Sequence, residues 1–337
     1  MCRWGKTDPS HHPLKDTPPS AGGGRGVTFA IWNAVAQHRG KTRNTLAISP
    51  KIHHNRTEVS PLESLFCCPL CSAGLERGDH QYRCPAGHSF DIAAAGYTHL
   101  LPANRKHSKN PGDDKEMVAA RSAFLDKGYY APLRDALCAL VVRETQGLTG
   151  PVLLDSGCGE GYYTTGLHQA LAAAGKAPRT AGVDLSKFAL RRAAKRLPGG
   201  EFAVASVYHL PLADGSADII TNVFSPLAAE EFARVLKPGG LYCYVVPSAL
   251  HLWEMKEVLY EKPYENQVKQ EDYPGFVWQG QETVRYTAHL EGSAHIMALF
   301  GMTPYAWKTP REGVARLAGL ETLDTQIGFD IHWYRRG

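Results

Sequence analysis

The chain has 337 residues, 43% of them hydrophobic and 21% charged, which suffices for two folded domains and excludes a fibrous or wholly disordered chain. No apolar run approaches the roughly 20 residues of a membrane-spanning helix, and the best short run, residues 27–36, lacks signal-peptide flanks. The net charge of +4 originates in the first 59 residues, which hold nine basic and three acidic residues. We therefore expect a cytoplasmic protein whose RNA contacts, if any, come from local basic patches.

The chain is expected to begin with a disordered extension over residues 1–64. This segment contains paired prolines, three consecutive glycines and scattered histidines, and it has too little periodic apolar content to fold alone. The motifs that follow divide the rest of the chain into three parts. These are a small metal-binding lobe over residues 65–105, linker helices over 106–148 and a larger α/β domain over 149–337.

The small lobe carries two short-spaced pairs of metal-binding residues. Cys68 and Cys71 form a C-x-x-C turn, and Cys84 and His88 follow after twelve residues. Four such ligands predict a closed tetrahedral zinc site, which would supply much of the folding free energy of so small a lobe. Cys67 is an alternative first ligand, but the spacing favours Cys68. A disulfide-bonded lobe is the other alternative, and the histidine and the expected compartment disfavour it.

The linker is expected to contain a helix over residues 113–127, with Asp113 or Asp114 as its N-terminal cap. Before this helix lies the one compact basic cluster outside the N-terminal extension, formed by Arg105, Lys106, His107 and Lys109. Such a cluster is either a contact for RNA phosphates or part of a solvated linker.

A glycine-rich loop follows the first strand of the larger domain. Residues 151–154 are apolar, Asp155 begins the loop, and Gly157, Gly159 and Gly161 alternate within it. Alternating glycines permit positive φ angles and let a ligand lie against the backbone. The G-x-G-x-G spacing differs from the G-x-G-x-x-G of dehydrogenases, and the loop has no lysine for a phosphate. The sequence therefore predicts a nucleotide-like ligand without a phosphate to neutralise.

Apolar segments alternate between strand and helix patterns through this domain. The predicted strands cover residues 151–155, 180–184, 201–205, 217–223 and 241–247. The predicted helices cover residues 162–174, 186–196, 227–235 and 249–261. A final antiparallel pair is expected at 285–291 and 324–333. The pattern predicts a Rossmann-like α/β fold with a seven-stranded, mostly parallel sheet.

Three signals in this order resemble the class I S-adenosylmethionine-dependent methyltransferases: Asp155 opening the glycine loop, Asp184 ending the next strand, and the turn at residues 236–241. The resemblance implies S-adenosylmethionine as the cofactor, with Gly157 and Gly159 beside it. An acid in the position of Asp184 holds ribose hydroxyls in related folds. Asp155 would orient the loop or the amino group of the methionine moiety. An ordinary strand–helix turn of another α/β protein is the alternative.

More specific segments lie in and after the lobe, namely His88–Asp91, Leu100–Pro102 and Gly128–Leu133. They resemble the large-subunit (23S) rRNA guanine-N1 methyltransferase family of the RlmA type, and the similarity runs over residues 66–336. The resemblance implies a zinc lobe that engages an rRNA hairpin, a Rossmann-like catalytic domain and a homodimer. By matching position, it gives Cys68, Cys71, Cys84 and His88 as the zinc ligands. The implied cofactor contacts are Tyr130, Gly159, Glu160 and His251.

Methylation of guanine N1 requires a nucleophile held in line with the sulfonium methyl group and the loss of the N1 proton. Residues 222–226 follow a predicted strand at the carboxyl edge of the sheet, where ligands bind in open α/β folds. Phe224 would stack on the base, and Ser225 or neighbouring carbonyls would contact its edge. Alternatively, Phe224 lies in the core and Ser225 caps the next helix. The aromatic segment at 260–280 is expected to form a lid over RNA bases or to cover the sheet.

Two other functions compete with rRNA methylation. A small-molecule methyltransferase could use the zinc lobe only as a lid over its pocket. A catalytically inactive RNA-binding relative is also conceivable, although the intact glycine loop disfavours it.

Overall fold

The computed structural model describes residues 62–105, 111–267 and 272–337. The expected disordered extension, apart from residues 62–64, lies outside the described residues, as do Lys106, His107 and Lys109 of the basic cluster. None of the helices within the described ranges is long and apolar enough to cross a membrane.

The small lobe is built on a four-stranded antiparallel sheet in the order β1-β2-β3-β4. Its strands are β1 (Leu62–Cys67), β2 (Gly74–Arg77), β3 (Gln81–Arg83) and β4 (Ser89–Asp91). The turn after β1 carries Cys68 and Cys71, and the turn after β3 carries Cys84 and His88. Adjacent hairpins thus bring the two predicted ligand pairs to one end of the small sheet.

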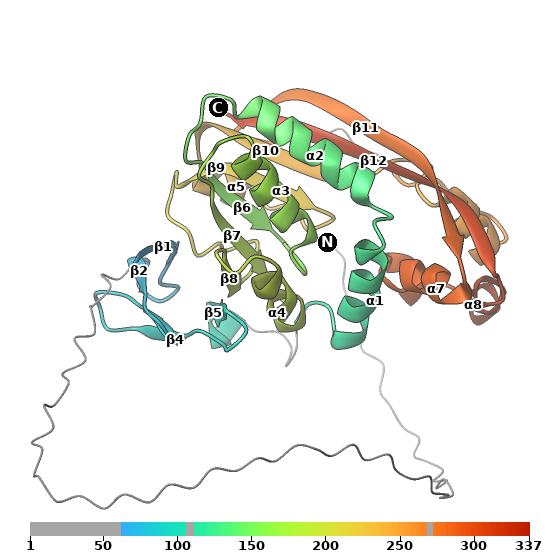
Figure 1. Cartoon of the computed structure of the whole chain (residues 1–337), viewed down its shortest axis with the longest axis horizontal. Helices are drawn as coiled ribbons and strands as arrows, with labels where there is room; N and C mark the ends of the chain where they lie inside the picture. The colour runs from blue at the N-terminus through green and yellow to red at the C-terminus, as the bar shows by residue number, and fades with distance from the viewer. Residues whose placement is uncertain (1–61, 106–110, 268–271) are drawn as a thin grey trace, which may run out of the picture. The chain divides into compact units, whose positions relative to one another are not determined.

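The larger sheet has the order β11-β12-β10-β9-β6-β7-β8-β5, and its central strands run parallel. The five predicted strands correspond to β6 (Val152–Ser156), β7 (Arg179–Asp184), β8 (Glu201–Val204), β9 (Ala217–Val223) and β10 (Leu236–Pro247). The antiparallel pair is β11 (Phe276–Glu291) and β12 (Thr322–Arg336), which form a long ribbon at one edge (Figure 1). The predicted α/β fold with a mostly parallel sheet is confirmed.

The larger sheet differs from the prediction at both edges. An eighth strand, β5 (Tyr97–His99), pairs in parallel with β8, although residues 65–105 were assigned to the small lobe. A three-residue strand has too little periodicity to be recognised. At the other edge, β11 begins at Phe276, so part of the expected lid segment is strand.

Eight α-helices and two short 3₁₀ helices occupy the described residues. The α-helices are α1 (Lys115–Asp126), α2 (Ala131–Glu144), α3 (Tyr162–Ala173), α4 (Lys187–Arg196), α5 (Ala229–Val235), α6 (Trp253–Leu259), α7 (Ser293–Gly301) and α8 (Arg311–Ala318). The 3₁₀ helices are η1 (Ala103–Arg105) and η2 (Pro304–Trp307). Asp114 caps α1, as expected, by accepting from the backbone N–H of Met117. Helix α6 begins four residues later than predicted because Leu252 has a left-handed φ of 59°.

The two faces of the larger sheet are covered by different elements. Leu153 and Ile219 pack with α2 and α3, which lie side by side in Figure 1. Their neighbours Leu154 and Ile220 point to the other face and pack in a cluster with α5 and residues of the zinc lobe. This alternation follows from the two-residue period of a strand. The lobe therefore shares a hydrophobic core with the larger sheet.

Glu201 at the start of β8 anchors the lobe to the larger sheet. Its carboxylate accepts from the Leu65 N–H at 3.0 Å, from the Tyr82 hydroxyl at 3.3 Å and from the Ser64 hydroxyl. Glu201 is only 8% exposed, so these bonds are shielded from water. One carboxylate thus joins two strands of the lobe to the parallel sheet.

We expect Glu201→Ala to lower the free energy of unfolding by about 2–4 kcal/mol, because it leaves partly or fully buried donors without an acceptor. Glu201→Gln keeps one acceptor oxygen and the side-chain volume, so its loss should be about half as large. Urea unfolding followed by circular dichroism measures both variants. Equal stability of wild type and Glu201→Ala would show that the carboxylate does not anchor the lobe.

Candidate functional site

The glycine loop between β6 and α3 is held by Asp184 at the end of β7. One oxygen of the Asp184 carboxylate accepts from the Gly159 N–H at 3.0 Å, and the other accepts from the Ser186 N–H at 2.7 Å. Gly161 has a φ of 78°, and a Cβ there would lie 2.9 Å from the Cα of Ala193 on α4. Only glycine allows α3 to start so close to α4.

Asp155 lies beneath this loop. It is 2% exposed and accepts hydrogen bonds from the hydroxyls of Thr164 on α3 and Thr221 on β9, the latter at 3.0 Å. Burial raises the pKa of Asp155 to about 6, against the opposing effect of the two threonine hydrogen bonds. Because both partners belong to the fold, the geometry favours the loop-orienting role among the two that the sequence left open.

A cavity of about 670 Å³ opens above the loop at the carboxyl edge of the parallel strands. It is lined by most of the residues predicted to form the site, namely Tyr130, Gly157, Gly159, Glu160, Asp184, Phe224, Ser225 and His251. Asp155 does not line it. The fold therefore assembles residues from five separate segments around one cavity, and their individual contacts to a ligand remain predictions.

Glu160 is engaged within the protein. It is 2% exposed, and its carboxylate accepts from Arg196 of α4 at 2.7 Å and from the hydroxyl of Ser122 on α1. Burial raises the pKa of Glu160, and the hydrogen bond from Ser122 and the charge of Arg196 oppose this shift. The bonds join α1 and α4 beneath the cavity wall. Any contact of Glu160 with a cofactor has to coexist with them.

His251 is a buried neutral histidine. Burial and, to a lesser extent, the nearby charge of Lys256 lower its pKa to about 3. Its Nδ1 accepts from the Gly328 N–H at 3.2 Å, so the proton of the neutral ring resides on Nε2. The ring packs against Phe329 with a centroid distance of 4.5 Å. His251 thus offers a hydrogen-bond donor rather than a base.

Phe224 and Ser225 form an exposed turn after β9. Phe224 has a left-handed φ of 55° and is 46% exposed, so it is not a core residue. Asn222 holds the turn by accepting from the Ser225 N–H at 3.3 Å and donating to the Pro226 carbonyl at 2.9 Å. Helix α5 has Ala228 as its N-cap, so Ser225 does not cap it. The alternative in which Phe224 lies in the core and Ser225 caps the next helix is therefore wrong, and the roles of both residues toward a ligand stay predictions.

Two buried hydroxyls on the cavity wall have no hydrogen-bond partner among the described residues, those of Tyr163 and Ser225. Buried polar groups are normally paired, so these hydroxyls indicate that a polar ligand completes the site. A Cβ at Gly157 would lie 2.0 Å from the Ser225 hydroxyl oxygen, so this glycine leaves room for the serine. These features fit a polar, nucleoside-bearing cofactor in the cavity.

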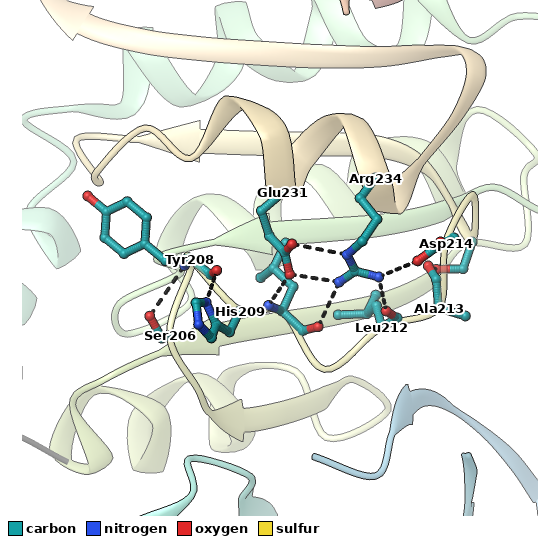
Figure 2. A network of polar contacts seen from close by, with 10 residues as sticks. Ser206, Tyr208, His209, Leu212, Ala213, Asp214, Glu231 and Arg234 are labelled. Atoms are coloured by element: carbon teal, nitrogen blue, oxygen red, sulfur yellow. Dashed lines mark hydrogen bonds and ion pairs between the residues drawn. The ribbon is translucent and has the colours of Figure 1, made fainter. Parts of the chain in front are cut away.

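A further wall of the cavity, not predicted from the sequence, is formed by Ser206, Val207 and Tyr208 in the loop after β8. Figure 2 shows how α5 clamps the continuation of this loop: Arg234 donates to the carbonyls of residues 210 and 212 at 3.0 and 2.8 Å. Glu231, one turn earlier on α5, accepts from the N–H of residue 210 at 2.6 Å. The sequence shows that Glu231 and Arg234 are spaced to pair on a helix, but it does not predict their partners in the loop.

The same loop contacts the zinc lobe. The Cys67 N–H donates to the Pro211 carbonyl at 2.8 Å, one residue before the first predicted zinc ligand. Val207 and Leu210 belong to the hydrophobic cluster that contains Cys68. One segment therefore lines the cavity and also contacts the zinc lobe.

The four predicted ligand atoms of the metal site lie within 4.8 Å of one another, at Cys68, Cys71, Cys84 and His88. The sulfurs of Cys71 and Cys84 are 3.7 Å apart, and Nδ1 of His88 lies 3.5 Å and 3.3 Å from the sulfurs of Cys68 and Cys84. With zinc–sulfur and zinc–nitrogen bonds of about 2.3 and 2.05 Å, a tetrahedron has edges of about 3.8 Å between sulfurs and about 3.6 Å between sulfur and nitrogen. The donor set and its spacing fit a closed structural zinc site.

Cys68→Ser should abolish zinc binding, and Cys67→Ser should retain one zinc per chain. Cys67 is the matched control because it is adjacent in sequence but is not among the four clustered ligand residues. Elemental analysis of both purified proteins measures the metal content. Because zinc binding contributes on the order of 10 kcal/mol to small zinc folds, Cys68→Ser should also lower the unfolding temperature. Retention of zinc by Cys68→Ser with its loss from Cys67→Ser would contradict this ligand set.

Comparisons with known proteins agree with both parts of the site. Residues 66–109 match a family described as "RlmA, N-terminal", a zinc ribbon, and residues 154–244 match a family described as "Methyltransferase domain". The 23S rRNA (guanine(748)-N(1))-methyltransferase of Streptomyces fradiae is 34% identical over 273 residues, which cover 78% of this chain and 95% of that protein.

Two further relatives are named provisionally as 23S rRNA (guanine-N(1)-)-methyltransferases. The protein of Micromonospora griseorubida is 38% identical, over 75% of this chain and 90% of its own length. That of Bacillus subtilis is 33% identical, over 80% of this chain and 96% of its own length. The predicted resemblance is therefore confirmed, and the chain belongs to the 23S rRNA (guanine-N(1))-methyltransferase family.

Proposed function

We propose that the protein transfers a methyl group from S-adenosylmethionine to N1 of a guanine in a hairpin loop of 23S rRNA. Family membership supports the reaction class. The observation that carries the proposal is the Phe224–Ser225 turn. Phe224 has a left-handed backbone conformation, is exposed and borders the cavity. Strained, exposed residues of this kind cluster at functional sites.

The order of the strands supports separate positions for the cofactor and the base along the edge of the sheet. Asp184 ends β7, the glycine loop follows β6, and the Phe224 turn follows β9, and these strands are neighbours in the order β7-β6-β9. We place the ribose at Asp184, the methionine moiety at the glycine loop and the target base at Phe224. The methyl group would then lie between the loop and the turn, within reach of a base stacked on Phe224.

S-adenosylmethionine supplies an electrophilic methyl group when bound. The N1 atom forms the new bond to the methyl carbon while the carbon–sulfur bond breaks, and the N1 proton passes to solvent. The protein residues contribute chiefly by orientation: Phe224 holds the base plane, and the Ser225 hydroxyl is free to bond its edge. His251, a predicted cofactor contact, offers its Nε2–H as a hydrogen-bond donor to an acceptor on the cofactor.

An unpaired base in a hairpin loop suits this arrangement, because flipping it into a cavity costs less than opening a base pair. The zinc lobe, joined to the cavity wall through Pro211, would contact the rest of the hairpin. We also propose a cytoplasmic location, which an rRNA substrate requires, and a homodimer, which the family resemblance implies. Sedimentation analysis tests the homodimer.

The reaction is tested by incubating the protein with S-adenosylmethionine and unmodified 23S rRNA, followed by mass spectrometry of the nucleosides. We expect 1-methylguanosine. Phe224→Ala should lower kcat/KM for RNA about 10- to 100-fold, because stacking of one base on an aromatic ring contributes about 1–3 kcal/mol. Phe224→Tyr keeps an aromatic face and should lose far less.

Binding of S-adenosylmethionine, measured by calorimetry, is the control for both variants. The affinity should stay within about twofold of wild type, since the turn is assigned to the base. A different methylated nucleoside would contradict the assigned position. Cofactor binding without any RNA methylation would favour the small-molecule or the inactive RNA-binding alternative.

A further inference from the structure

Helix α6 carries a completely buried lysine, Lys256. Its ammonium donates to the Tyr264 carbonyl at 2.9 Å and to Oδ1 of Asn266 at 2.8 Å. It also lies 4.8 Å from the ring centre of Tyr264 and 5.3 Å from that of Tyr305. Within the described ranges no carboxylate lies at ion-pair distance from it. Among the described residues the ammonium is therefore held by neutral groups, and it polarises the carbonyl and the amide that accept its hydrogen bonds.

The other titratable groups near Lys256 that the structure describes form no ion pair with it. Glu265, on the following segment, is exposed and only partly offsets the lowering of the Lys256 pKa by burial. His251 on the preceding turn is neutral, and Tyr305 on η2 is a phenol whose pKa burial raises. Helix α8 contributes Arg316, which donates to carbonyls at the end of α6.

The remaining contacts of α6 lie away from the ammonium. Strand β12 meets the helix at Glu254, whose carboxylate accepts from the hydroxyl of Thr325 and the N–H of Gln326. Glu257, also on α6, accepts from Nε1 of Trp253. Both carboxylates are thus engaged elsewhere.

Lys256 determines the orientation of the Asn266 amide. The ammonium can only donate, so the Asn266 atom that contacts it must be the oxygen, which also accepts from the Tyr305 hydroxyl at 3.2 Å. The amide nitrogen therefore points the other way, and it donates one hydrogen to the Ser248 carbonyl at 2.8 Å. Its second hydrogen has no acceptor among the described residues, and Asn266 lines the cavity, so we take this hydrogen as a donor to a ligand.

Asn266 lies at the β10 end of this cavity, which we assign to the substrate. Its backbone N–H bonds to Ala249, directly after β10, and β10 lies beyond β9 in the order β7-β6-β9-β10. Asp184 at the end of β7 marks the opposite end, where we place the ribose. His251, which the family resemblance assigns to the cofactor, bonds the same Ser248 carbonyl, so we assign the donor of Asn266 to the part of the cavity where the cofactor meets the base.

We propose that Asn266 is a specificity-determining residue that donates a hydrogen bond to O6 of the target guanine, and that Lys256 is the positioning residue that orients and polarises its amide. The inference rests on the proposed guanine-N1 reaction. Guanine presents an acceptor, O6, beside N1, whereas adenine presents an amino group that would face the Asn266 donor. As N1 loses its proton, negative charge moves to O6, and the hydrogen bond strengthens in the transition state.

Two substitutions test the pair on an RNA hairpin containing the target guanine. Asn266→Asp keeps the acceptor for Lys256 but loses the donor, so kcat should fall by about 100-fold. Lys256→Gln keeps a hydrogen-bond donor but removes the charge, so kcat should fall by about tenfold. Lys176→Gln is the matched control, because Lys176 also donates to backbone carbonyls, between residues 145 and 148, and is not among the residues that line the cavity.

The pH profile separates an electrostatic role from a structural one. The rate should rise with pH as N1–H ionises, and a nearby positive charge favours that ionisation. Lys256→Gln should therefore move the rising limb of kcat to higher pH, while Lys176→Gln leaves it unchanged. The dissociation constant of S-adenosylmethionine should stay within about twofold in all three variants.

The outcomes distinguish the two proposals. If the wild-type protein forms no 1-methylguanosine, the proposed function fails and this inference fails with it. If wild type forms it but Asn266→Asp is equally active, or if Lys256→Gln slows the reaction with an unmoved pH profile, only this inference is wrong. Weaker cofactor binding by Lys256→Gln would assign the charge to the cofactor carboxylate instead, and would also overturn it.

Discussion

The carboxylate of Asp184 is the constraint on which the site depends. It accepts from backbone N–H groups of both loops that follow the central strands β6 and β7. Each loop alone would leave a polar backbone unpaired at a buried edge, and the shared carboxylate satisfies both. With the glycine loop held in this way, α3 starts close to α4, and the cavity opens above the strand ends.

Different segments at that edge of the sheet contribute different parts of the site. The strand order places Asp184, the glycine loop, the exposed Phe224 turn and the Lys256–Asn266 pair in succession, and on our proposal different segments bind the cofactor and the base. The zinc lobe is not an independent appendage, because Glu201 and the loop clamped by Arg234 join it to the sheet and to the cavity wall. A rigid connection of this kind would fix the distance between a lobe that binds RNA and the cavity that receives one base.

Local sequence patterns were sufficient to predict the fold and many of the residues that line the cavity. The glycine spacing, the acid after β7 and the Cys/His pairs each depend on a few adjacent residues, so they were readable from the sequence. Strand β5 was missed because its three residues are a strand only by pairing with β8. The Lys256–Asn266 contact and the Arg234 clamp were missed because both depend on tertiary placement of polar residues, which have no periodicity. Leu252 has a left-handed backbone conformation, and α6 begins only after it. The predicted helix began too early because a leucine in the sequence gives no sign of this conformation.

The most direct test is a structure of the protein bound to S-adenosylhomocysteine and a 23S rRNA hairpin containing the target guanine. The account predicts the ribose at Asp184, the guanine ring stacked on Phe224, its N1 facing the sulfur, and its O6 within hydrogen-bond distance of the Asn266 amide nitrogen. A guanine bound elsewhere, or a cofactor whose ribose lies at the β10 end of the cavity, would contradict the assignment of the strand ends to the two ligands.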